Sequence, residues 1–370
     1  MSRRLFVCAL AALATAARAE NLPLEEVLVT VSKRAATRMD VPGTVSVFDG
    51  ELLRDEGIGD IRAAQALLPA IRLQQENTST QVYIRGIGST LDFPQLDPPS
   101  SLHLNGVYVP REANSTALFD LAQLEVLPGP QGTLYGRSTL GGVVNASFAR
   151  PGEGDPGFLL LEAGNYDSRR LSAAGDVDLG RDLTVRLATD YQYRDGYLAS
   201  GADALDNLAG RLSLTWEPGD RFSAYGWVNA AAMDGSPPNL VVKGVDPATG
   251  DLAPASYLRS DPWNDRFAAP WDGFLPFGQP QAGDYRKYEN ILAGGEFRYR
   301  LGPGLTLSYL PAYTDFVVSS NYWLGAFPAN KTDSYQQQIH ELRLQGTAGR
   351  ADWLAGLYAY RMDSDGYFMF

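Results

Sequence analysis

The sequence predicts a small α+β domain followed by antiparallel transmembrane β-barrel strands, and two features of the pattern carry this prediction. Downstream of residue 150, apolar and polar residues alternate with a period of two, which is typical of strands with one dry and one wet face. The connections between these strands alternate between tight turns and longer loops, as in outer-membrane barrels. A soluble β-sandwich is the alternative, but nothing sorts its loops by length so regularly.

Residues 1–19 are expected to form a secretory signal peptide. A positively charged start is followed by an apolar run from Leu5 to Ala16, and Ala17-Arg18-Ala19 places small residues where a signal peptidase cleaves. The alternative is an apolar first helix of a soluble domain. The single cysteine, Cys8, lies inside this segment. The mature chain is therefore expected to lack disulfides, cysteine-ligated zinc and a cysteine nucleophile.

Charge and hydropathy argue against two classes of protein. The net charge is −12 at pH 7, and removal of the three arginines of residues 1–19 makes it −15. Such an acidic protein is poorly suited to bind nucleic acid by neutralising phosphates. No apolar run reaches the roughly 18 residues that a membrane-spanning helix needs. The 38 glycines, 19 tyrosines and 15 phenylalanines suit many strands and tight turns better than a helical bundle.

Residues 40–150 are expected to form the α+β domain. Asp60 to Leu68 predicts a short amphipathic helix that Pro69 ends. Short apolar runs predict strands at Gln81–Arg85, Leu102–Val109 and Leu124–Leu127.

Residues 151–370 are expected to form the barrel strands. In Leu183–Arg194, leucine, valine and tyrosine alternate with a polar set made up of Thr184, Arg186, Asp190, Gln192 and Arg194. The same pattern predicts about nine strands, near 158–164, 169–179, 183–193, 207–216, 221–232, 288–301, 305–318, 334–346 and 351–362. Tyr225 and Trp227 fall opposite Phe222 in the fifth of these, and an aromatic girdle at the membrane interface is the expected explanation.

The connections divide into turns and loops. Gly180-Arg181-Asp182 and Gly302-Pro303-Gly304 have the composition of hairpin turns. Met233–Lys287 and Val318–Asp333 are predicted to be long outer loops that capture a ligand. An open sheet cannot span lipid, because its edges leave backbone groups unsatisfied. The barrel is therefore expected to be incomplete, as in a fragment or a truncated reading frame.

Several motifs of the α+β domain occur in a specific order. The first pieces are Val41-Pro42 and Val45-Ser46-Val47-Phe48, and the second is Gln81-Val82-Tyr83-Ile84-Arg85-Gly86-Ile87-Gly88-Ser89. Asn105-Gly106-Val107-Tyr108 follows, and then Leu124–Ser138, which reads Leu-Glu-Val-Leu-Pro-Gly-Pro-Gln-Gly-Thr-Leu-Tyr-Gly-Arg-Ser. Gly141-Gly142-Val143-Val144-Asn145 closes the run. In this order the motifs resemble the plug domain of TonB-dependent outer-membrane receptors. The resemblance is strong over residues 25–150 and looser over the barrel strands, of which about 22 are expected in a family-like barrel.

The resemblance assigns the glycine-rich motifs to the plug. Its motif residues are Arg85, Gly86, Gly88, Gly129, Gln131, Gly132, Tyr135, Gly136, Gly141 and Gly142. The later glycines are expected to allow tight turns where the plug presses against the barrel wall. A dinucleotide-binding loop is the alternative for Gly86 and Gly88, but no third glycine or following helix fits.

The resemblance also implies how the plug docks. In the family, an arginine of the Ile-Arg-Gly motif and another just before Gly-Pro-Gln-Gly pair with barrel carboxylates. Arg85 matches the first position, but Pro128 stands at the second, where Arg137 is the candidate substitute. Glu296 and Glu341 are the expected partners, since both lie on the polar faces of predicted strands. Paired buried charges of this kind specify geometry more than they add stability.

Residues 20–39 are expected to hold the TonB box and a linker. The segment that resembles a TonB box consists of Glu26, Val27, Leu28, Val29 and Thr30. An extended β-branched segment beside a linker is what adding a strand to a partner's sheet requires. An ordinary first strand of the plug is the alternative.

The resemblance implies a ligand-gated importer in the outer membrane of a Gram-negative bacterium. Its expected cargo is a large, scarce nutrient, with ferric siderophore as the commonest class. Its expected partners are TonB with the inner-membrane energising complex, outer-membrane lipid and the barrel-assembly machinery. No cofactor, metal, nucleic acid or enzymatic activity is expected, since no triad, carboxylate pair or metal cluster stands out. A passive porin, a secreted β-rich hydrolase and a non-functional truncated receptor remain as alternatives.

Overall fold

The computed structural model describes residues 28–29, 36–37, 44–68, 70–75, 79–89, 97–114, 116–154, 157–237, 263, 284–324, 327–349 and 351–369. The chain divides into two units, Met1–Gly43 and Thr44–Phe370. In the first unit, β1 (Leu28–Val29) pairs antiparallel with β2 (Ala36–Thr37). The predicted signal peptide lies outside the described residues. Everything that follows belongs to the second unit.

The second unit begins with residues 44–148, which we call the α+β domain. Its elements in chain order are β3 (Ser46–Asp49), α2 (Gly50–Asp55), α3 (Ile61–Ala64), η1 (Gln65–Leu67), β4 (Ile71–Gln75), β5 (Thr80–Ile84), β6 (Ser100–Leu104), β7 (Val107–Val109), η2 (Arg111–Ala113), β8 (Leu121–Pro128), α4 (Gly132–Tyr135) and β9 (Gly142–Phe148). A five-stranded sheet has the order β3-β8-β9-β6-β7, with β6 and β9 parallel. β4 and β5 form a separate two-stranded antiparallel sheet.

Local signals explain the short elements. Asp60 accepts a hydrogen bond from the Ala63 amide at 2.8 Å and so caps α3. The predicted helix continues from α3 into a 3-10 turn, η1. The predicted strand Leu102–Val109 is instead a hairpin of β6 and β7. Asn105 and Gly106 both have positive φ angles, which is the two-residue turn that an Asn-Gly pair favours.

The core of the α+β domain consists of side chains from both helical and strand segments. Those with no exposure include Ile61, Ile84, Leu102, Leu124 and Val144. Among the described residues, no helix is long and apolar enough to cross a membrane.

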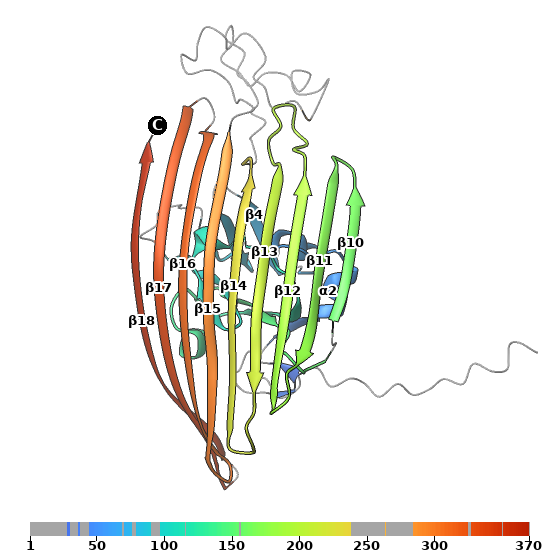
Figure 1. The fold of residues 1–370 in the computed structure, drawn as a ribbon. Coiled ribbons are helices and arrows are strands. Elements are labelled where there is room, and N and C mark those ends of the chain that lie inside the picture. Colours follow the sequence, from blue (N-terminus) through green and yellow to red (C-terminus); the bar gives the residue numbers. More distant parts are fainter. Residues whose placement is uncertain are drawn as a thin grey trace, which may run out of the picture. The chain divides into compact units, whose positions relative to one another are not determined.

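A nine-stranded antiparallel sheet follows, in which each strand pairs with its neighbour in sequence (Figure 1). Its strands are β10 (Gly157–Gly164), β11 (Ser168–Asp178), β12 (Leu183–Arg194), β13 (Leu205–Trp216), β14 (Phe222–Gly235), β15 (Tyr285–Gly302), β16 (Leu305–Leu324), β17 (Phe327–Ala348) and β18 (Ala351–Met369). The expected fold class is confirmed, with a strand at each predicted position. β10 and β18 form the two edges of this sheet as described.

The prediction of an outer loop at Val318–Asp333 is wrong. β16 continues to Leu324 and β17 begins at Phe327, and these two residues are paired. Polar composition suggested a loop, but burial still alternates here: Ser320, Lys331 and Asp333 are buried on the inner face. A strand whose inner face is polar looks like a loop when only its composition is read. The other predicted loop, Met233–Lys287, begins and ends within β14 and β15, and most of it lies outside the described residues.

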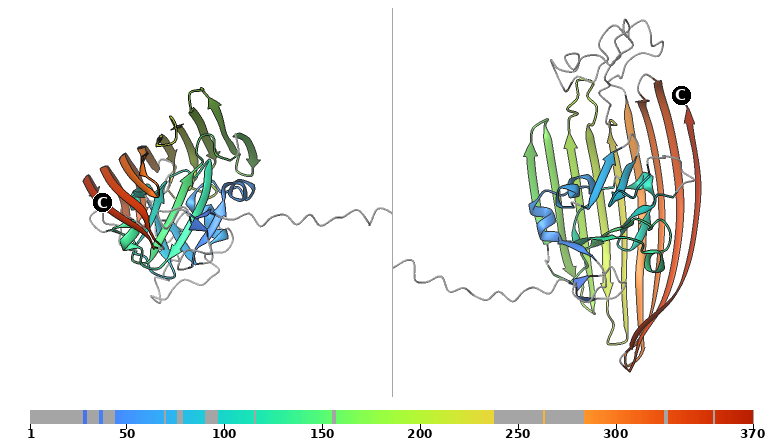
Figure 2. Two further views of the ribbon diagram at one scale, coloured as in Figure 1. Left: turned by 90° about the horizontal axis from the view of Figure 1, so that it is seen from below. Right: turned by 180° about the vertical axis from the view of Figure 1, so that it is seen from behind.

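Burial in the nine-stranded sheet is inverted relative to a soluble protein. Leu159 and Leu187 expose 69% and 58% of their surface, whereas Arg186 on the same strand as Leu187 exposes 2%. The α+β domain lies against one face of the sheet (Figure 2). The side chains buried on that face are polar residues such as Arg186 together with an apolar cluster that includes Trp227 and Phe316. An apolar outer face over a polar inner face is the pattern of a sheet that meets lipid on one side.

The aromatic residues of β14 correct a further expectation. Tyr225 and Trp227 are 3% and 5% exposed and belong to the buried cluster that joins the sheet to the α+β domain. The Trp227 ring lies edge-on to Phe148 of β9, with 5.1 Å between ring centroids. These two side chains therefore contact the domain and do not form an aromatic girdle.

Candidate functional site

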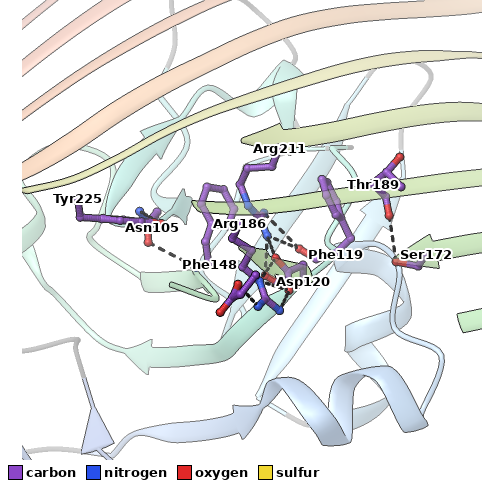
Figure 3. A network of polar contacts seen from close by, with 10 residues as sticks. Asn105, Phe119, Asp120, Phe148, Ser172, Arg186, Thr189, Arg211 and Tyr225 are labelled. Atoms are coloured by element: carbon purple, nitrogen blue, oxygen red, sulfur yellow. Dashed lines mark hydrogen bonds and ion pairs between the residues drawn. The ribbon is translucent and has the colours of Figure 1, made fainter. Parts of the chain in front are cut away.

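The contact between the α+β domain and the sheet has a buried carboxylate at its centre. Asp120 lies just before β8, is 2% exposed and has a φ angle of 48°. Its side chain points out of the domain toward β12 and β13 (Figure 3). Positive φ is uncommon for a residue with a side chain and is tolerated better by aspartate than by most. The turn places this carboxylate against the sheet.

Two arginines of the sheet bind the Asp120 carboxylate. Arg186 of β12 donates from Nε at 3.0 and 3.1 Å and from Nη2 at 2.7 Å. Arg211 of β13 donates from Nη2 to Oδ2 at 2.7 Å and to the Asp120 backbone carbonyl at 2.6 Å. Bonds between a guanidinium and a carboxylate are among the stronger hydrogen bonds in proteins and fix the relative orientation of the groups.

A second carboxylate balances the charge of this cluster. Arg186 Nη1 donates to Asp176 of β11 at 2.7 Å, and Asp176 is its directly paired cross-strand neighbour. Asp176 also accepts the Gly152 amide at 2.8 Å. Two arginines thus face two aspartates, and the side chains of Arg186, Arg211 and Asp120 are at most 1% exposed. Removing one member of such a buried set leaves an uncompensated charge, which is strongly destabilising.

Aromatic rings enclose the Arg211 guanidinium. Its Cζ atom lies 4.0 Å from the centroid of the Phe148 ring and 4.8 Å from that of Phe119. Its Nη1 and Nη2 atoms also approach the Phe119 carbonyl oxygen at 3.3 Å. Cation–π contacts of this kind are favourable when the charge is desolvated. We call Asp120, Asp176, Arg186 and Arg211 the central ion cluster.

A second ion pair lies beside the central ion cluster. Arg150, just after β9, donates to Glu296 of β15 at 2.6 Å, and its Cζ lies 4.3 Å from the centroid of the Tyr225 ring. Arg298 donates to the other Glu296 oxygen at 2.8 Å. Burial alone would lower the pKa of Arg150, but the Glu296 carboxylate outweighs it and the pKa is raised. Arg150 therefore stays charged beside the sheet.

Uncharged contacts extend the interface along the sheet. The Tyr288 hydroxyl donates to the Ala113 carbonyl at 3.3 Å, and the Gln337 amide donates to the Tyr108 carbonyl at 2.8 Å. Strands from β12 to β17 thus bind the domain through side chains of their inner faces.

The structure does not bring Arg85 to Glu296 or Glu341. Arg85 is exposed in the turn after β5, with a φ angle of 51°. Among the described residues its side chain forms no hydrogen bond or ion pair, although its amide donates to the Ala70 carbonyl at 2.8 Å. Glu296 pairs with Arg150 instead, and Glu341 pairs with its strand neighbour Arg343 at 2.7 Å.

Arg137 lies against the sheet but not against its carboxylates. It forms a salt bridge with Asp97 of the α+β domain. Its Cζ lies 4.4 Å from the centroid of the Tyr360 ring of β18 and 5.8 Å from that of Tyr108. The predicted substitute arginine thus contacts the sheet through an aromatic ring.

The glycine-rich motif forms the connection from β8 to β9. Gly142 opens β9 with a φ angle of 142°, and a Cβ atom there would collide with the Leu127 carbonyl and lie 3.0 Å from Ile84 Cδ1. Gly136 ends α4 with a φ angle of 76°, and a Cβ there would lie 3.9 Å from the Tyr358 ring of β18. Both positions require glycine for backbone reasons.

The remaining motif residues hold this connection or its neighbours. The Gly129 amide donates to the Gly141 carbonyl at 2.9 Å, the Gln131 amide donates to the Thr139 carbonyl at 3.0 Å, and Gly132 begins α4. Tyr135 is buried, with its ring centroid 5.0 Å from that of His103, and burial raises the pKa of its phenol. Gly86 and Gly88 lie in the turn after β5.

The predicted TonB box is described only at Leu28 and Val29, which form β1. Glu26, Val27 and Thr30 lie outside the described residues. Leu28 and Val29 belong to the first unit, whereas the interface described above is formed by residues of the second unit.

Sequence reasoning missed the central ion cluster, although part of its signal was present. Arg186 lies on the polar face of a predicted strand, and a charge in the middle of such a face needs a partner. Asp120 precedes an ordinary strand and carries no periodic signal. Only the fold shows that its turn lies against β12 and β13. In the described part of the chain, no three His, Cys, Asp or Glu side chains gather as a metal site would need.

A family model agrees with the architecture of the α+β domain. Residues 37–143 match the TonB-dependent Receptor Plug Domain.

Relatives of known function are similar over more than this segment. The chain is 28% identical over 256 residues to the pesticin receptor of Yersinia pestis, covering 64% of this chain and 37% of that receptor. It is 26% identical over 201 residues to the ferrioxamine B receptor of Salmonella typhimurium, covering 51% and 27%. The chain therefore spans well under half the length of these relatives.

Solved structures share the fold. The ferric yersiniabactin uptake receptor of Yersinia pestis superposes with a TM-score of 0.70 and 19% identity, covering 88% of this chain and 49% of that one. The siderophore receptor PiuA of Acinetobacter baumannii gives a TM-score of 0.71 and 18% identity, covering 90% and 47%. The domain and nine-stranded sheet thus have the arrangement found in these receptors.

Proposed function

We propose that this chain, which carries the plug domain and barrel strands of the TonB-dependent receptors, serves the ligand-gated active uptake of a large, scarce nutrient. Its relatives are receptors and transporters rather than enzymes.

One observation carries the proposal: the plug is held on the polar face of the sheet by a buried, charge-balanced set of ion pairs. A barrel of about 22 strands is too wide for its own side chains to fill, and a plug closes it. Ion pairs oriented by Asp120 fix the plug in one position. In the proposed transport cycle, a mechanical pull would break this attachment, and the same ion pairs would re-form afterwards. A passive porin needs no such domain.

We propose ferric siderophore as the transported class. The names of similar proteins support this: one is a receptor for ferrioxamine B, and another takes up ferric yersiniabactin. The ligand would bind on the side of the plug that faces the longer connections between strands.

Energy for transport would come from TonB and its inner-membrane complex. Residues Glu26 to Thr30 would add as a strand to the TonB sheet. In the structure Leu28 and Val29 already pair with β2, which supports an extended conformation for the box. TonB would pair either in place of β2 or along the other edge of β1.

The proposed location is the outer membrane of a Gram-negative bacterium. The exposed leucines and aromatic residues of β10 to β18 would contact outer-membrane lipid, and the barrel-assembly machinery would insert the strands. We propose the division of the chain that the sequence predicts. Residues 1–19 would form the signal peptide, residues 20–39 the TonB box and linker, residues 40–150 the plug, and residues 151–370 the barrel strands.

The test is uptake by cells that carry or lack the gene. Cells lacking it would be offered radioactive iron(III) loaded on hydroxamate, catecholate and carboxylate siderophores, with a strain lacking TonB in parallel. We expect at least one chelate to lose uptake in both strains, and the gene supplied in trans to restore it. Uptake that needs the gene but not TonB would favour a passive channel and contradict the proposal.

A further inference from the structure

A small enclosed cavity lies between the plug and the sheet, away from the central ion cluster. Its volume is about 10 Å³, counted as the space that the centre of a water molecule could occupy. The plug contributes α3 with its cap and β5, and the sheet contributes β13, β14 and β15. The lining residues are Asp60, Ile61, Arg62, Thr80, Leu205, Asn207, Met233 and Arg286.

Arg286 is the unusual member of this lining. It lies near the start of β15 and is only 7% exposed. Its Nη1 atom is buried, and within the described residues it has no hydrogen-bond partner. A buried guanidinium that forms no direct ion pair carries a desolvation penalty that other contacts must offset.

Asp203 and Asp60 lie close enough to favour the charged form of Arg286, but among the described residues neither forms an ion pair with it. Arg62 pairs with Asp60 at 3.0 Å and with Asp203 at 3.8 Å. Asp203 also pairs with Arg194 at 3.3 Å. Asp60 accepts the Ala63 amide in addition, and Asp203 accepts the Tyr197 hydroxyl. Both carboxylates thus bind other donors, although Asp203 Oδ1 has no hydrogen-bond partner among the described residues. Three arginines, namely Arg62, Arg194 and Arg286, face these two aspartates.

We propose that this cavity binds one small monovalent anion of the halide class, chloride under natural conditions. Arg286 would supply the charge. Asn207, which also lines the cavity, would supply an N–H donor. The enclosed, water-sized space excludes a carboxylate-bearing or phosphate-bearing ligand. A chloride ion would balance the excess positive charge, whereas a water molecule would not.

The anion would bridge the two parts of the protein. Thr80 and Arg62 belong to the plug, whereas Asn207 and Arg286 belong to the sheet. Halide binding would therefore stabilise the docked plug, independently of whether the proposed transport function holds. Anything that binds only the folded state raises the unfolding temperature with ligand concentration.

The first test compares the unfolding temperature of the detergent-purified protein in sodium chloride and in sodium gluconate at equal ionic strength. We expect a higher temperature in chloride, rising with its concentration. Arg286→Gln should abolish this difference. Arg300→Gln, which changes the same charge at an exposed position of the same strand, should retain it. Equal temperatures in the two salts, or a chloride effect that survives Arg286→Gln, would overturn the proposal.

The second test keeps the proposal decidable if Arg286→Gln does not fold. Crystals of the unaltered protein grown or exchanged in sodium bromide would be measured at the bromine absorption edge. An anomalous peak within hydrogen-bond distance of Arg286 Nη1 supports the anion site. A cavity that is empty or holds only water would refute it.

Discussion

At the scale of single residues, the plug is attached by charges that the strand pattern hides. Asp120 is an ordinary turn residue by sequence, yet both of its oxygens bind arginines of neighbouring strands. Arg150 provides a second pair with Glu296. The family arginine at position 85 is exposed in the part of the chain that the structure describes. In the described part of the chain, Asp120 and Arg150 make the ion pairs with the sheet that sequence had assigned to Arg85. A docking role for Arg85 stays a prediction.

Asp120→Asn should loosen the plug strongly. It removes the only carboxylate that binds Arg211 among the described residues and leaves Arg186 with Asp176 alone. Both arginine side chains are 1% exposed, so we expect a loss of about 3–5 kcal/mol from plug docking. Ion conductance in planar bilayers and sensitivity of cells to large antibiotics should both rise. Asp167→Asn, which breaks an exposed pair with Arg169, is the matched control and should change neither. Equal behaviour of the two variants would show that the buried cluster does not hold the plug.

Arg150→Gln should weaken docking more than Arg85→Gln. The first change removes a hydrogen bond to Glu296 and a ring contact with Tyr225, together worth about 1–3 kcal/mol. The second removes an exposed side chain. Denaturant-induced release of the plug, followed by the fluorescence of the nearby Trp227, would compare them. The reverse order would restore Arg85 as the principal docking residue.

At the scale of elements, strands that share one architecture differ in what they contact. The outer faces of β10 to β14 carry exposed leucines and valines, whereas the inner faces of β12 to β17 carry the polar groups that meet the plug. Polar inner residues also explain why β16 and β17 were predicted too short. β1 is different again, because it belongs to the first unit and pairs with β2 through Leu28 with Thr37 and Val29 with Ala36.

Val29→Pro should uncouple binding from transport. Proline removes a backbone donor and restricts φ, so neither β2 nor TonB can pair fully with the segment. In cells, ligand binding at the surface should persist while energy-dependent uptake stops. Val29→Ile keeps the β-branched side chain and the donor, and should transport normally. Normal uptake by Val29→Pro would place the coupling segment elsewhere.

At the scale of the whole molecule, the protein is organised around a sheet that is polar inside and apolar outside. Such a sheet has no stable place in water unless its outer face is covered. Lipid covers it in the proposed location. The plug covers the inner face, and its ion pairs are protected from water by both partners.

Leu212→Arg tests the lipid-facing side of the sheet. Leu212 is 49% exposed and lies in the interior of β13. On a soluble protein an exposed substitution of this kind would have little effect. In a bilayer we expect a cost of up to about 2–4 kcal/mol, because a charge on the lipid face must be desolvated. The amount of assembled protein in outer-membrane fractions should fall, and Leu212→Ile should leave it unchanged. Normal assembly of Leu212→Arg would indicate that this face meets water.

Sequence alone determined the repeating parts of this protein. A period of two over many residues, with glycine-rich turns at one end, predicted nine strands at the positions observed, because side-chain alternation depends only on local backbone geometry. Ordered motifs identified the plug for the same reason: Gly142 and Asn105-Gly106 reflect backbone conformations set within a few residues. The tertiary structure alone decided the partners. Asp120 and Arg186 are 66 residues apart, and Arg150 and Glu296 are 146 residues apart. No local rule relates residues at such separations, because the pairing depends on how the plug is seated against the sheet. A strand's polar face shows that a charge will be buried, but only the packed fold determines which counter-charge meets it.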